Sequence, residues 1–380
     1  MKVISLFSGC GGLDLGFALA GHNIVWANDF NEDAVKTYNN HIGRYFHHEA
    51  ICEDIVKLLD KSKEDINNLI PNGDIVIGGF PCQGFSIANL DRNMEDERNY
   101  LYLQLLKVIS VKQPKYFLLE NVKGLENIEG GKILPMIMDD LENAGTENSK
   151  FFPDNANHGY TVVYNVVNSL LFGVPEKRER VIILGIRNDV LGSSPLKAFI
   201  SPKANSKKYD SRKKLQVWYT HSVDSNTDEP LPLVTKINNL YDDFVNGKIN
   251  CIEPMIPNEM YRTTTLRDAI ADLPEEYSEN IANHQGSKCK VRIRNVMGNR
   301  ATYWDKYSPT ITARGSGTGG PLIPPHPNAN RRFTVRECAR IQTFPDQIIF
   351  TGSNSSGYRQ VGNAVPVLMA YNLALMFNKK

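Results

Sequence analysis

Short apolar runs alternate with helix-like segments over the first 190 residues of the chain. Between these runs, segments 32–40 and 102–109 repeat apolar residues at helical spacing. The runs themselves are typical of buried strands and occupy residues 2–7, 23–28, 74–79, 115–120 and 180–186. Strands that alternate with helices predict an α/β fold in which helices cover both faces of a parallel sheet.

This rhythm stops near residue 190 and returns near residue 330. The intervening stretch is rich in Ser, Asn, Pro and Lys, and only 265–273 reads as a clear helix. Afterwards, Thr334 and Glu337 have the spacing of a capping box, and 366–377 forms an apolar helical run. The pattern predicts a domain built from 1–190 and 330–380, with a smaller, loop-rich domain at 191–329.

Composition restricts the class of protein. The chain has 380 residues, 41% of them hydrophobic and 22% charged, which is ordinary for a globular protein and excludes a disordered one. It has neither a basic segment followed by an apolar leader nor an apolar run of about 18 residues, so we expect a cytoplasmic protein without membrane contact. The six cysteines form no CxxC pair, which predicts neither a disulfide framework nor a metal site.

Charge is distributed unevenly along the chain. Residues 1–200 carry 19 Lys and Arg against 26 Asp and Glu, a balance of −7, whereas residues 201–380 carry 24 against 16, a balance of +8. Two basic clusters, 201–216 and 286–300, dominate the second half. Such clusters are often solvated loops, but the opposite sign of the two halves favours a nucleic-acid-binding face there.

A glycine-rich loop follows the first predicted strand. Gly9 and Gly11 allow backbone N–H groups to approach a ligand, and the next helix offers its N-terminus. Asp29 follows the second strand at the distance where nucleotide sites place an acid for ribose hydroxyls. The loop suits NAD, FAD, a nucleoside-type cofactor or simply a tight turn, and Phe30 with Asp54 favours an adenosyl ligand.

Cys82 follows the third long apolar run, 74–79, and Glu120 ends the fourth, 115–120. Carboxyl ends of strands in a doubly wound sheet meet in one crevice, so we expect the thiol and the carboxylate to share a site. Taken singly, Cys82 is a core thiol or a nucleophile, and Glu120 a salt-bridge partner or a site residue. Arg178 and Arg180 enter the next strand at alternate positions, which suits surface ion pairs or the binding of a phosphate or a base carbonyl.

Six motifs together carry a family resemblance. In chain order they are FSGCGG at 7–12, GGFPCQGFS at 78–86, ENVKG at 120–124, EKRERV at 176–181, FTVRECARIQTFPD at 333–346 and QVGNAVP at 360–366. This set and its order resemble the C5-cytosine DNA methyltransferases, in particular bacterial modification enzymes. The resemblance covers about 1–190 and 330–380. It implies a Rossmann-like, doubly wound mixed sheet, with the family's target-recognition domain in the stretch between.

The resemblance also implies roles for individual residues. Cys82 is the nucleophile, Glu120 contacts cytosine N3 and its amine, Arg180 contacts O2, and Arg178 supports the site. Pro81 lies near the methyl group. The S-adenosylmethionine pocket is formed by Phe7, Gly9, Gly11, Asp29, Phe30, Asp54, Ile55, Pro81 and Asn363.

Two positions depart from the family pattern. Glu176 stands where the family usually has Gln, and Asn99 follows Arg98 where the family usually has Gly. The first substitution alters a hydrogen bond and the second stiffens a loop that closes over DNA, but neither position carries a proposed chemical group.

The resemblance implies a monomer that acts on double-stranded DNA, without metal, beside a restriction endonuclease that acts on the same sequence and is not stably bound. Arg300 and Arg314 are candidates to pair with guanine in the major groove. Two alternatives use the same motifs: the family's transfer-RNA branch, which the long basic insertion disfavours, and an inactive DNA-binding module, which the presence of Cys82 and Glu120 disfavours. A dehydrogenase would explain the glycine loop but not the Pro-Cys pair or the paired arginines.

Overall fold

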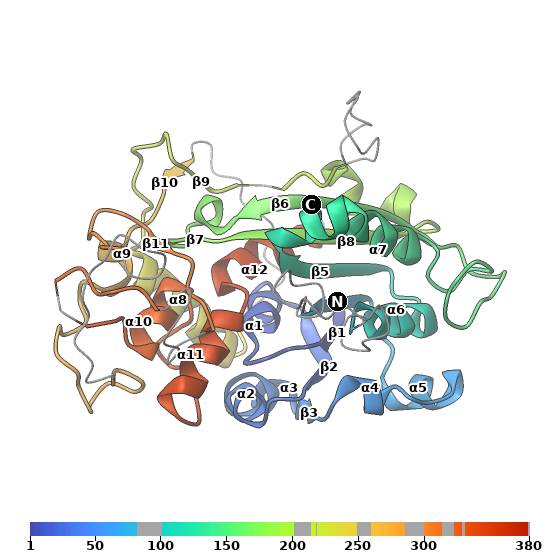
Figure 1. The fold of residues 1–380 in the computed structure, drawn as a ribbon, viewed down its shortest axis with the longest axis horizontal. Coiled ribbons are helices and arrows are strands. Elements are labelled where there is room, and N and C mark those ends of the chain that lie inside the picture. Colours follow the sequence, from blue (N-terminus) through green and yellow to red (C-terminus); the bar gives the residue numbers. More distant parts are fainter. Residues whose placement is uncertain are drawn as a thin grey trace.

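A seven-stranded sheet forms the centre of the molecule (Figure 1). The computed structural model describes residues 1–81, 101–200, 214–217, 219–248, 260–285, 300–313, 323–328 and 331–378. The strand order is β3-β2-β1-β4-β5-β8-β6. The strands are β1 Lys2–Leu6, β2 Asn23–Asp29, β3 Ile51–Cys52, β4 Ile75–Gly79, β5 Tyr116–Val122, β6 Tyr160–Asn168 and β8 Glu179–Arg187. All five predicted strands are present, and β3 and β6 are additional.

The expectation of a wholly parallel sheet was wrong for one strand, β8, which lies between β5 and the edge strand β6. Strands β1 to β5 are parallel, but β8 runs antiparallel to both β5 and β6, which gives the mixed sheet that the family resemblance implies. Apolar periodicity reports burial and not strand direction, so the pattern could not reveal this reversal. The reversal brings the start of β8 beside the end of β5, where Arg180 pairs with Val122.

Helices cover both faces of the sheet. Helices α1 Gly12–Leu19, α2 Glu32–Tyr38 and α12 Val367–Leu375 lie on one face, and α5 Lys63–Leu69, α6 Leu101–Lys112 and α7 Ile133–Glu142 lie on the other. Successive strand residues alternate between the two apolar cores: Val3, Ile75 and Leu118 face one, and Ile4, Val76 and Leu119 face the other. The sheet is therefore doubly wound, as predicted.

Helices α1 and α12, the first and last in chain order, pack directly together. A Cβ on Gly16 of α1 would lie 2.3 Å from Ala370 Cβ of α12, so the two backbones approach too closely for any larger side chain. The side chain of Asn378 also donates to Ala20 O at 3.1 Å. Helix α12 and the residues after it thus complete the helical layer to which α1 belongs.

The stretch after residue 190 holds more regular structure than its composition indicates. The predicted helix is present as α9 Leu266–Ile270, but α8 Leu233–Val245 and the small parallel pair of β9 His221–Ser222 and β10 Tyr261–Arg262 were not predicted. Leu233 and Ile237 of α8 join the same apolar core as α1. The domain limits proposed from the sequence therefore stay a prediction.

The C-terminal segments follow their sequence signals. Helix α10 Val335–Ile341 begins with the predicted capping box, in which Thr334 and Glu337 bond each other's backbone N–H groups. Helix α11 Asn354–Asn363 follows, and Pro366 precedes α12. Within the described ranges, every helix is too short or too polar to cross a membrane.

Candidate active site

An arginine–carboxylate pair lies where β5 ends and β8 begins. Arg180 Nε contacts Glu120 Oε1 at 2.8 Å, and the two side chains remain 12% and 11% exposed. Gly79 of β4 lies beside Glu120, and a Cβ at that position would come within 3.1 Å of its Oε2. The missing side chain at Gly79 leaves room for the carboxylate. The structure thus brings together two of the residues predicted to bind the base.

The exit of β4 is fixed against the same edge. The Asn121 side chain, itself buried, donates to Phe80 O at 3.0 Å and ties this exit to the end of β5. Pro81 follows and lines a pocket. Cys82 and Asn99 lie outside the described residues, so their predicted roles stay predictions.

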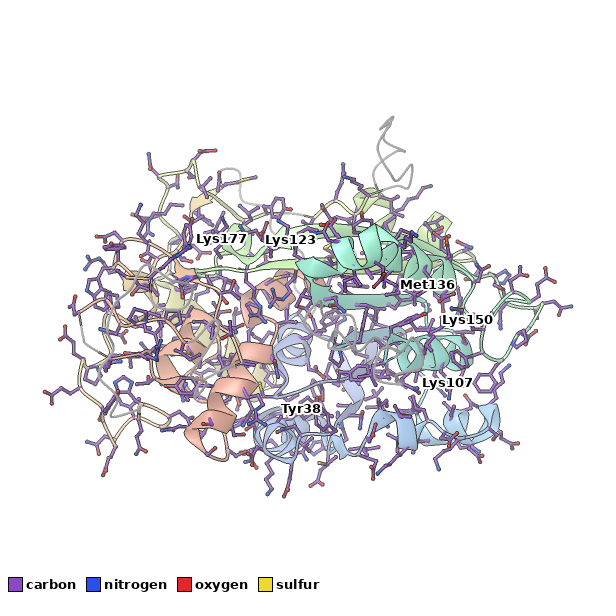
Figure 2. All side chains as sticks on the ribbon, in the orientation of Figure 1. Tyr38, Lys107, Lys123, Met136, Lys150 and Lys177 are labelled. Atoms are coloured by element: carbon purple, nitrogen blue, oxygen red, sulfur yellow. The ribbon has the colours of Figure 1, made fainter. Side chains whose placement is uncertain are left out.

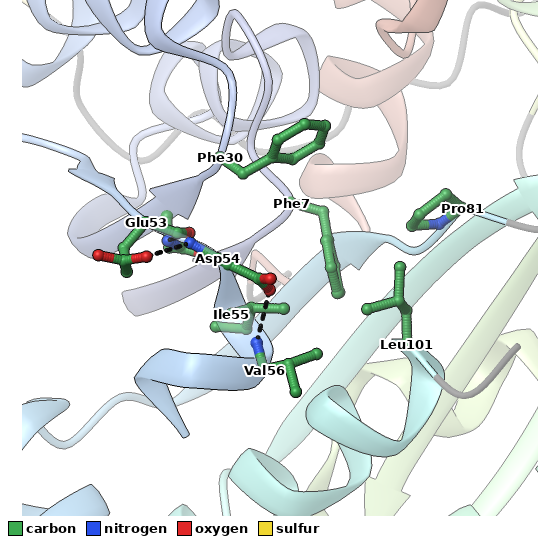
Figure 3. A pocket seen from close by; sticks show the side chains of 9 residues that line it. Phe7, Phe30, Glu53, Asp54, Ile55, Val56, Pro81 and Leu101 are labelled. Carbon is green, nitrogen blue, oxygen red and sulfur yellow. Dashed lines mark hydrogen bonds between the residues drawn. The ribbon is translucent and has the colours of Figure 1, made fainter. Parts of the chain in front are cut away.

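A cavity of about 290 Å³ opens at the carboxyl ends of β1, β2 and β4 (Figure 3). Five predicted cofactor residues line it: Phe7, Phe30, Asp54, Ile55 and Pro81. Sequence reasoning missed four others: Asn28, Glu53, Val56 and Leu101. Three of the four directly adjoin a predicted residue, so chain proximity was the available signal. Leu101 begins α6 and reaches the pocket from a different element.

Phe7 enters the pocket from a strained backbone. Its φ of 56° lies in the left-handed region, which costs a bulky residue about 1–2 kcal/mol. The next residue is held by a hydrogen bond from Ser8 N to Asn28 O at 2.9 Å. The Asn28 side chain in turn donates to Ile51 O and Glu53 O, both at 2.9 Å. These bonds fix the turn after β1 and the wall that carries Glu53.

Two carboxylates give the pocket its charge. Asp54 caps helix α4 Ile55–Leu58 by accepting from Val56 N at 2.9 Å, and Glu53 accepts from Asp54 N at 3.0 Å (Figure 3). No basic side chain is among the described lining residues. The cavity therefore suits a ligand with a flat apolar ring, hydroxyl or amine donors, and positive charge.

The glycine loop lies next to the pocket without lining it. Gly9 N donates to Asp29 Oδ2 and Gly11 N donates to Ser8 O, both at 2.9 Å, so these two amides already have partners inside the protein. Gly11 has φ +90°, and a Cβ there would meet Ile42 Cδ1 at 2.2 Å. Burial raises the pKa of Asp29. Gly9, Gly11 and Asp29 are not among the described lining residues, and their ligand contacts stay predictions.

Arg178 is buried and bonded to backbone carbonyls. Its guanidinium donates to Ile311 O at 3.0 Å, Gly362 O at 3.0 Å and Ala364 O at 2.9 Å. Only 2% of its side chain is exposed. These bonds fix the backbone around Arg178, and the supporting role that the resemblance implies for this residue stays a prediction. Asn363, exposed at the end of α11, lies between two of these carbonyls and also does not line the pocket.

Lysines surround the start of β8. Lys123, after β5, pairs with Glu179 at 3.0 Å, and Lys177 belongs to the short strand β7 Glu176–Lys177 (Figure 2). Lys177 is exposed, and Arg300 is exposed at the end of the second basic cluster. Arg314 and most of both basic clusters lie outside the described residues. The described cations suit contacts with a phosphate backbone.

Comparison with known proteins identifies the class. Residues 1–379 match the family model described as C-5 cytosine-specific DNA methylase. The chain therefore belongs to this family, and it is a DNA (cytosine-5)-methyltransferase. Of the alternatives that the sequence left open, this assignment supports the DNA-directed enzyme.

Individual relatives agree with this assignment. The chain is 34% identical to the type II methyltransferase M.NgoFVII of Neisseria gonorrhoeae over 368 residues, which cover 96% of this chain and 83% of the relative. It is 31% identical to the type II methyltransferase M.FnuDI of Fusobacterium nucleatum, over 98% and 93% of the two chains. The fold is similar to that of the S. pombe Dnmt2 methyltransferase, with a TM-score of 0.56 and 19% identity over 99% and 98% of the chains.

Proposed function

We propose that this enzyme transfers a methyl group from S-adenosylmethionine to C5 of a cytosine in a short, specific sequence of duplex DNA. The observation that carries the proposal is the Glu120–Arg180 pair, which lies at the same sheet edge as the pocket that Pro81 lines. Cys82, the next residue in sequence, is assigned as the nucleophile. We further propose a cytoplasmic monomer that forms the modification half of a restriction–modification system, because the named relatives are type II methyltransferases.

The described pocket fits the proposed methyl donor. Aromatic and aliphatic side chains, among them Phe7 and Phe30, suit a purine ring, while Glu53 and Asp54 suit hydroxyl groups, an amine and a positive charge. When bound, S-adenosylmethionine supplies a methyl group on a positively charged sulfur. The chain's own residues must then make cytosine C5 nucleophilic.

The reaction begins with addition of the Cys82 thiolate to C6, because C5 alone is too weak a nucleophile. The electron pair moves into the ring toward N3 and O2. The Glu120 carboxyl group contacts N3 and the exocyclic amine, and Arg180 donates to O2, which stabilises the developing charge. C5 then takes the methyl group from the sulfonium, and the electron pair of the broken S–CH3 bond stays on sulfur, so that S-adenosylhomocysteine leaves as a neutral thioether. Loss of the C5 proton to solvent returns its electrons to the ring, and the C6–S bond breaks to release the thiolate.

Access to C6 requires the base to leave the helix. Flipping costs a few kcal/mol, which contacts between protein and DNA must offset. Lys177 and the lysines and arginines of the basic clusters in 191–329 are assigned to the phosphate backbone, while Arg300 stays a candidate to pair with guanine. An endonuclease that cuts the same sequence would act on DNA independently, without stable binding to this chain.

A trapped covalent complex tests the proposal. First, expression in a methylation-free host and genome-wide mapping of 5-methylcytosine identifies the target sequence. A duplex with 5-fluorocytosine at the target then accepts the methyl group, but fluorine cannot leave as a proton, so we expect the enzyme to stay bound through a denaturing gel. The trap should require S-adenosylmethionine.

Cys82→Ser is the matched control, because a hydroxyl is a far poorer nucleophile at neutral pH. We expect no trap with this variant. A trap that forms equally well with Cys82→Ser would show that another residue is the nucleophile. Absence of 5-methylcytosine in the host genome would contradict the proposed activity itself.

A further inference from the structure

Strands β6 and β8 are antiparallel neighbours and form a hairpin through residues 169–178. A short segment of the second half of the chain is bound along this hairpin where it leads into β8. Strand β11 Ser308–Pro309 pairs in parallel with β7. Ser308 N donates to Pro175 O at 2.8 Å, and the Thr310 hydroxyl donates to Lys177 O at 2.7 Å. We call residues 308–313 the docked segment. It lies directly before Arg314, a residue predicted to read bases.

Two buried side chains hold both backbone polar groups of one residue in this segment. Ile311 N donates to Glu176 Oε1 at 2.6 Å, and Ile311 O accepts from Arg178 Nη1 at 3.0 Å. Glu176 is completely buried. Ile311 is thus fixed in both directions by side chains two residues apart on the hairpin.

The same arginine reaches the end of α11. Arg178 Nη2 donates to the carbonyls of Gly362 and Ala364, on either side of Asn363. Gly362 also packs on the docked segment, since a Cβ there would come within 2.3 Å of the Thr312 carbonyl carbon. A shift of the docked segment must therefore move either Arg178 or the turn that carries Asn363.

Burial makes this arrangement costly. Glu176 Oε1 and Arg178 Nη1 are 3.6 Å apart with almost no exposed surface, and such a pair gains little net free energy from its charges. Burial raises the pKa of the Glu176 carboxyl and lowers the pKa of Arg178 to about 10. A hydrophobic pair would fill the space at lower cost, but it could not hold Ile311, Gly362 and Ala364.

We propose that Glu176 and Arg178 are positioning residues that couple the docked segment to the Asn363 turn, so that cofactor and target DNA bind cooperatively. The inference rests on the proposed function, because it assigns DNA to the side of the docked segment and the cofactor to the Asn363 side. The two residues act through backbone groups and touch neither ligand. Coupling between the ligands arises because both bias one shared arrangement.

The experiment measures the affinity of the wild-type enzyme for a duplex carrying its mapped target, with and without saturating S-adenosylhomocysteine. We expect this product to tighten DNA binding by about tenfold, within the usual range of coupling between sites. Glu176→Ala should bring that ratio close to one. Glu176→Gln keeps an acceptor for Ile311 N and should restore the ratio.

Two further variants keep the outcome decisive. Thr310→Val removes a single bond of the docked segment and should lower the ratio about twofold, even if Glu176→Ala fails to fold. Glu179→Ala removes a partly exposed carboxylate from the same hairpin and should leave the ratio unchanged. Thermal unfolding of each variant checks its fold.

Three results would overturn the inference: a ratio of one in the wild type, an unchanged ratio in folded Glu176→Ala, or, if that variant does not fold, an unchanged ratio in Thr310→Val. If Glu176 had only a structural role, its replacement would weaken DNA binding equally with and without S-adenosylhomocysteine. The ratio would then be unchanged in folded Glu176→Ala, which overturns the inference. Methyl transfer by the wild type is measured in parallel. Its absence would refute the proposed function, whereas normal transfer with unchanged ratios refutes only the coupling.

Discussion

Two arginine–carboxylate pairs meet at the start of β8, and they differ in almost everything except composition. Glu120 and Arg180 contact each other at 2.8 Å and remain partly exposed at the sheet edge. Glu176 and Arg178 lie 3.6 Å apart in the interior, where the arginine is bonded mainly to carbonyl groups. The first pair is free to meet a substrate, whereas the second holds the backbone. Surroundings, and not residue type, decide what such a pair does.

The strongest test of this difference is Glu120→Gln. We expect kcat to fall by about 10²–10⁴, since a positioned acid contributes that much, while DNA affinity changes little. Single-turnover methylation and DNA-binding titrations would measure both. A variant with normal kcat would remove Glu120 from the chemistry and make the two pairs equivalent.

Stability should respond in the opposite way. Arg178→Ala leaves the Glu176 carboxyl buried without its cation, and we expect a loss of about 3–5 kcal/mol in the free energy of unfolding. Arg180→Ala also leaves a mostly buried carboxylate without its cation, but Glu120 keeps 11% of its side chain exposed to water, so we expect a smaller loss of about 1–3 kcal/mol. Urea denaturation of the two variants gives the comparison directly. Equal losses would show that burial does not separate the pairs.

A third carboxylate is buried without an arginine. Asp14 accepts from the Tyr38 hydroxyl at 3.2 Å, and no lysine or arginine of the described residues forms an ion pair with it. Burial raises the pKa of Asp14 from 3.8 to about 7. A raised carboxyl pKa means that the native state binds the proton more tightly, so this contribution to stability is complete below about pH 4 and is lost as pH rises to about 7.

Asp14→Asn should remove that pH dependence. Relative to this variant, we expect the wild type to lose up to about 4 kcal/mol of unfolding free energy between pH 4 and pH 8. Urea denaturation across this range measures the difference. Parallel stability curves for the two proteins would contradict the raised pKa.

The smallest effects should come from the carboxylates of the pocket, which face a ligand and not a buried cation. Asp54→Ala should weaken S-adenosylmethionine binding about tenfold, because it removes a charged hydrogen-bond acceptor. Glu53→Gln should weaken S-adenosylmethionine binding only about threefold. The same variant should weaken binding of S-adenosylhomocysteine still less, because that ligand lacks the sulfonium charge. Calorimetry on the enzyme without DNA separates these changes from recognition.

The sequence predicted five of the seven strands of the sheet, because buried apolar runs and turn residues are local signals. It did not predict β6 or the direction of β8, since pairing partners lie far apart in the chain. Helix α8 was missed although Leu233, Ile237 and Tyr241 recur at helical spacing, because the polar composition around them dominated the interpretation. In that region the spacing of apolar residues was a better predictor of the helix than the overall composition.

The site was predicted unevenly for a related reason. Motifs indicated Phe7, Asp54 and Glu120, but they could not show that the glycine-loop amides bond within the protein. The resemblance gave Arg178 and Arg180 different roles, but their local sequence could not show that Arg178 would be buried and bonded to distant carbonyl groups. These bonds depend on Ile311 and Gly362, residues 133 and 184 positions away from Arg178.

The contact between Gly16 and Ala370 has a consequence for synthesis of the protein. Ribosomes add about 5–20 residues per second, so α1 waits roughly 20–70 s before α12 exists. During that time the side of α1 that packs on α12 has no permanent partner, and truncated chains never acquire one. We expect nascent chains to depend on chaperones over this interval, and products that stop before α12 to be degraded or to aggregate. Completion of translation is thus a condition for forming the methyl-transferring enzyme.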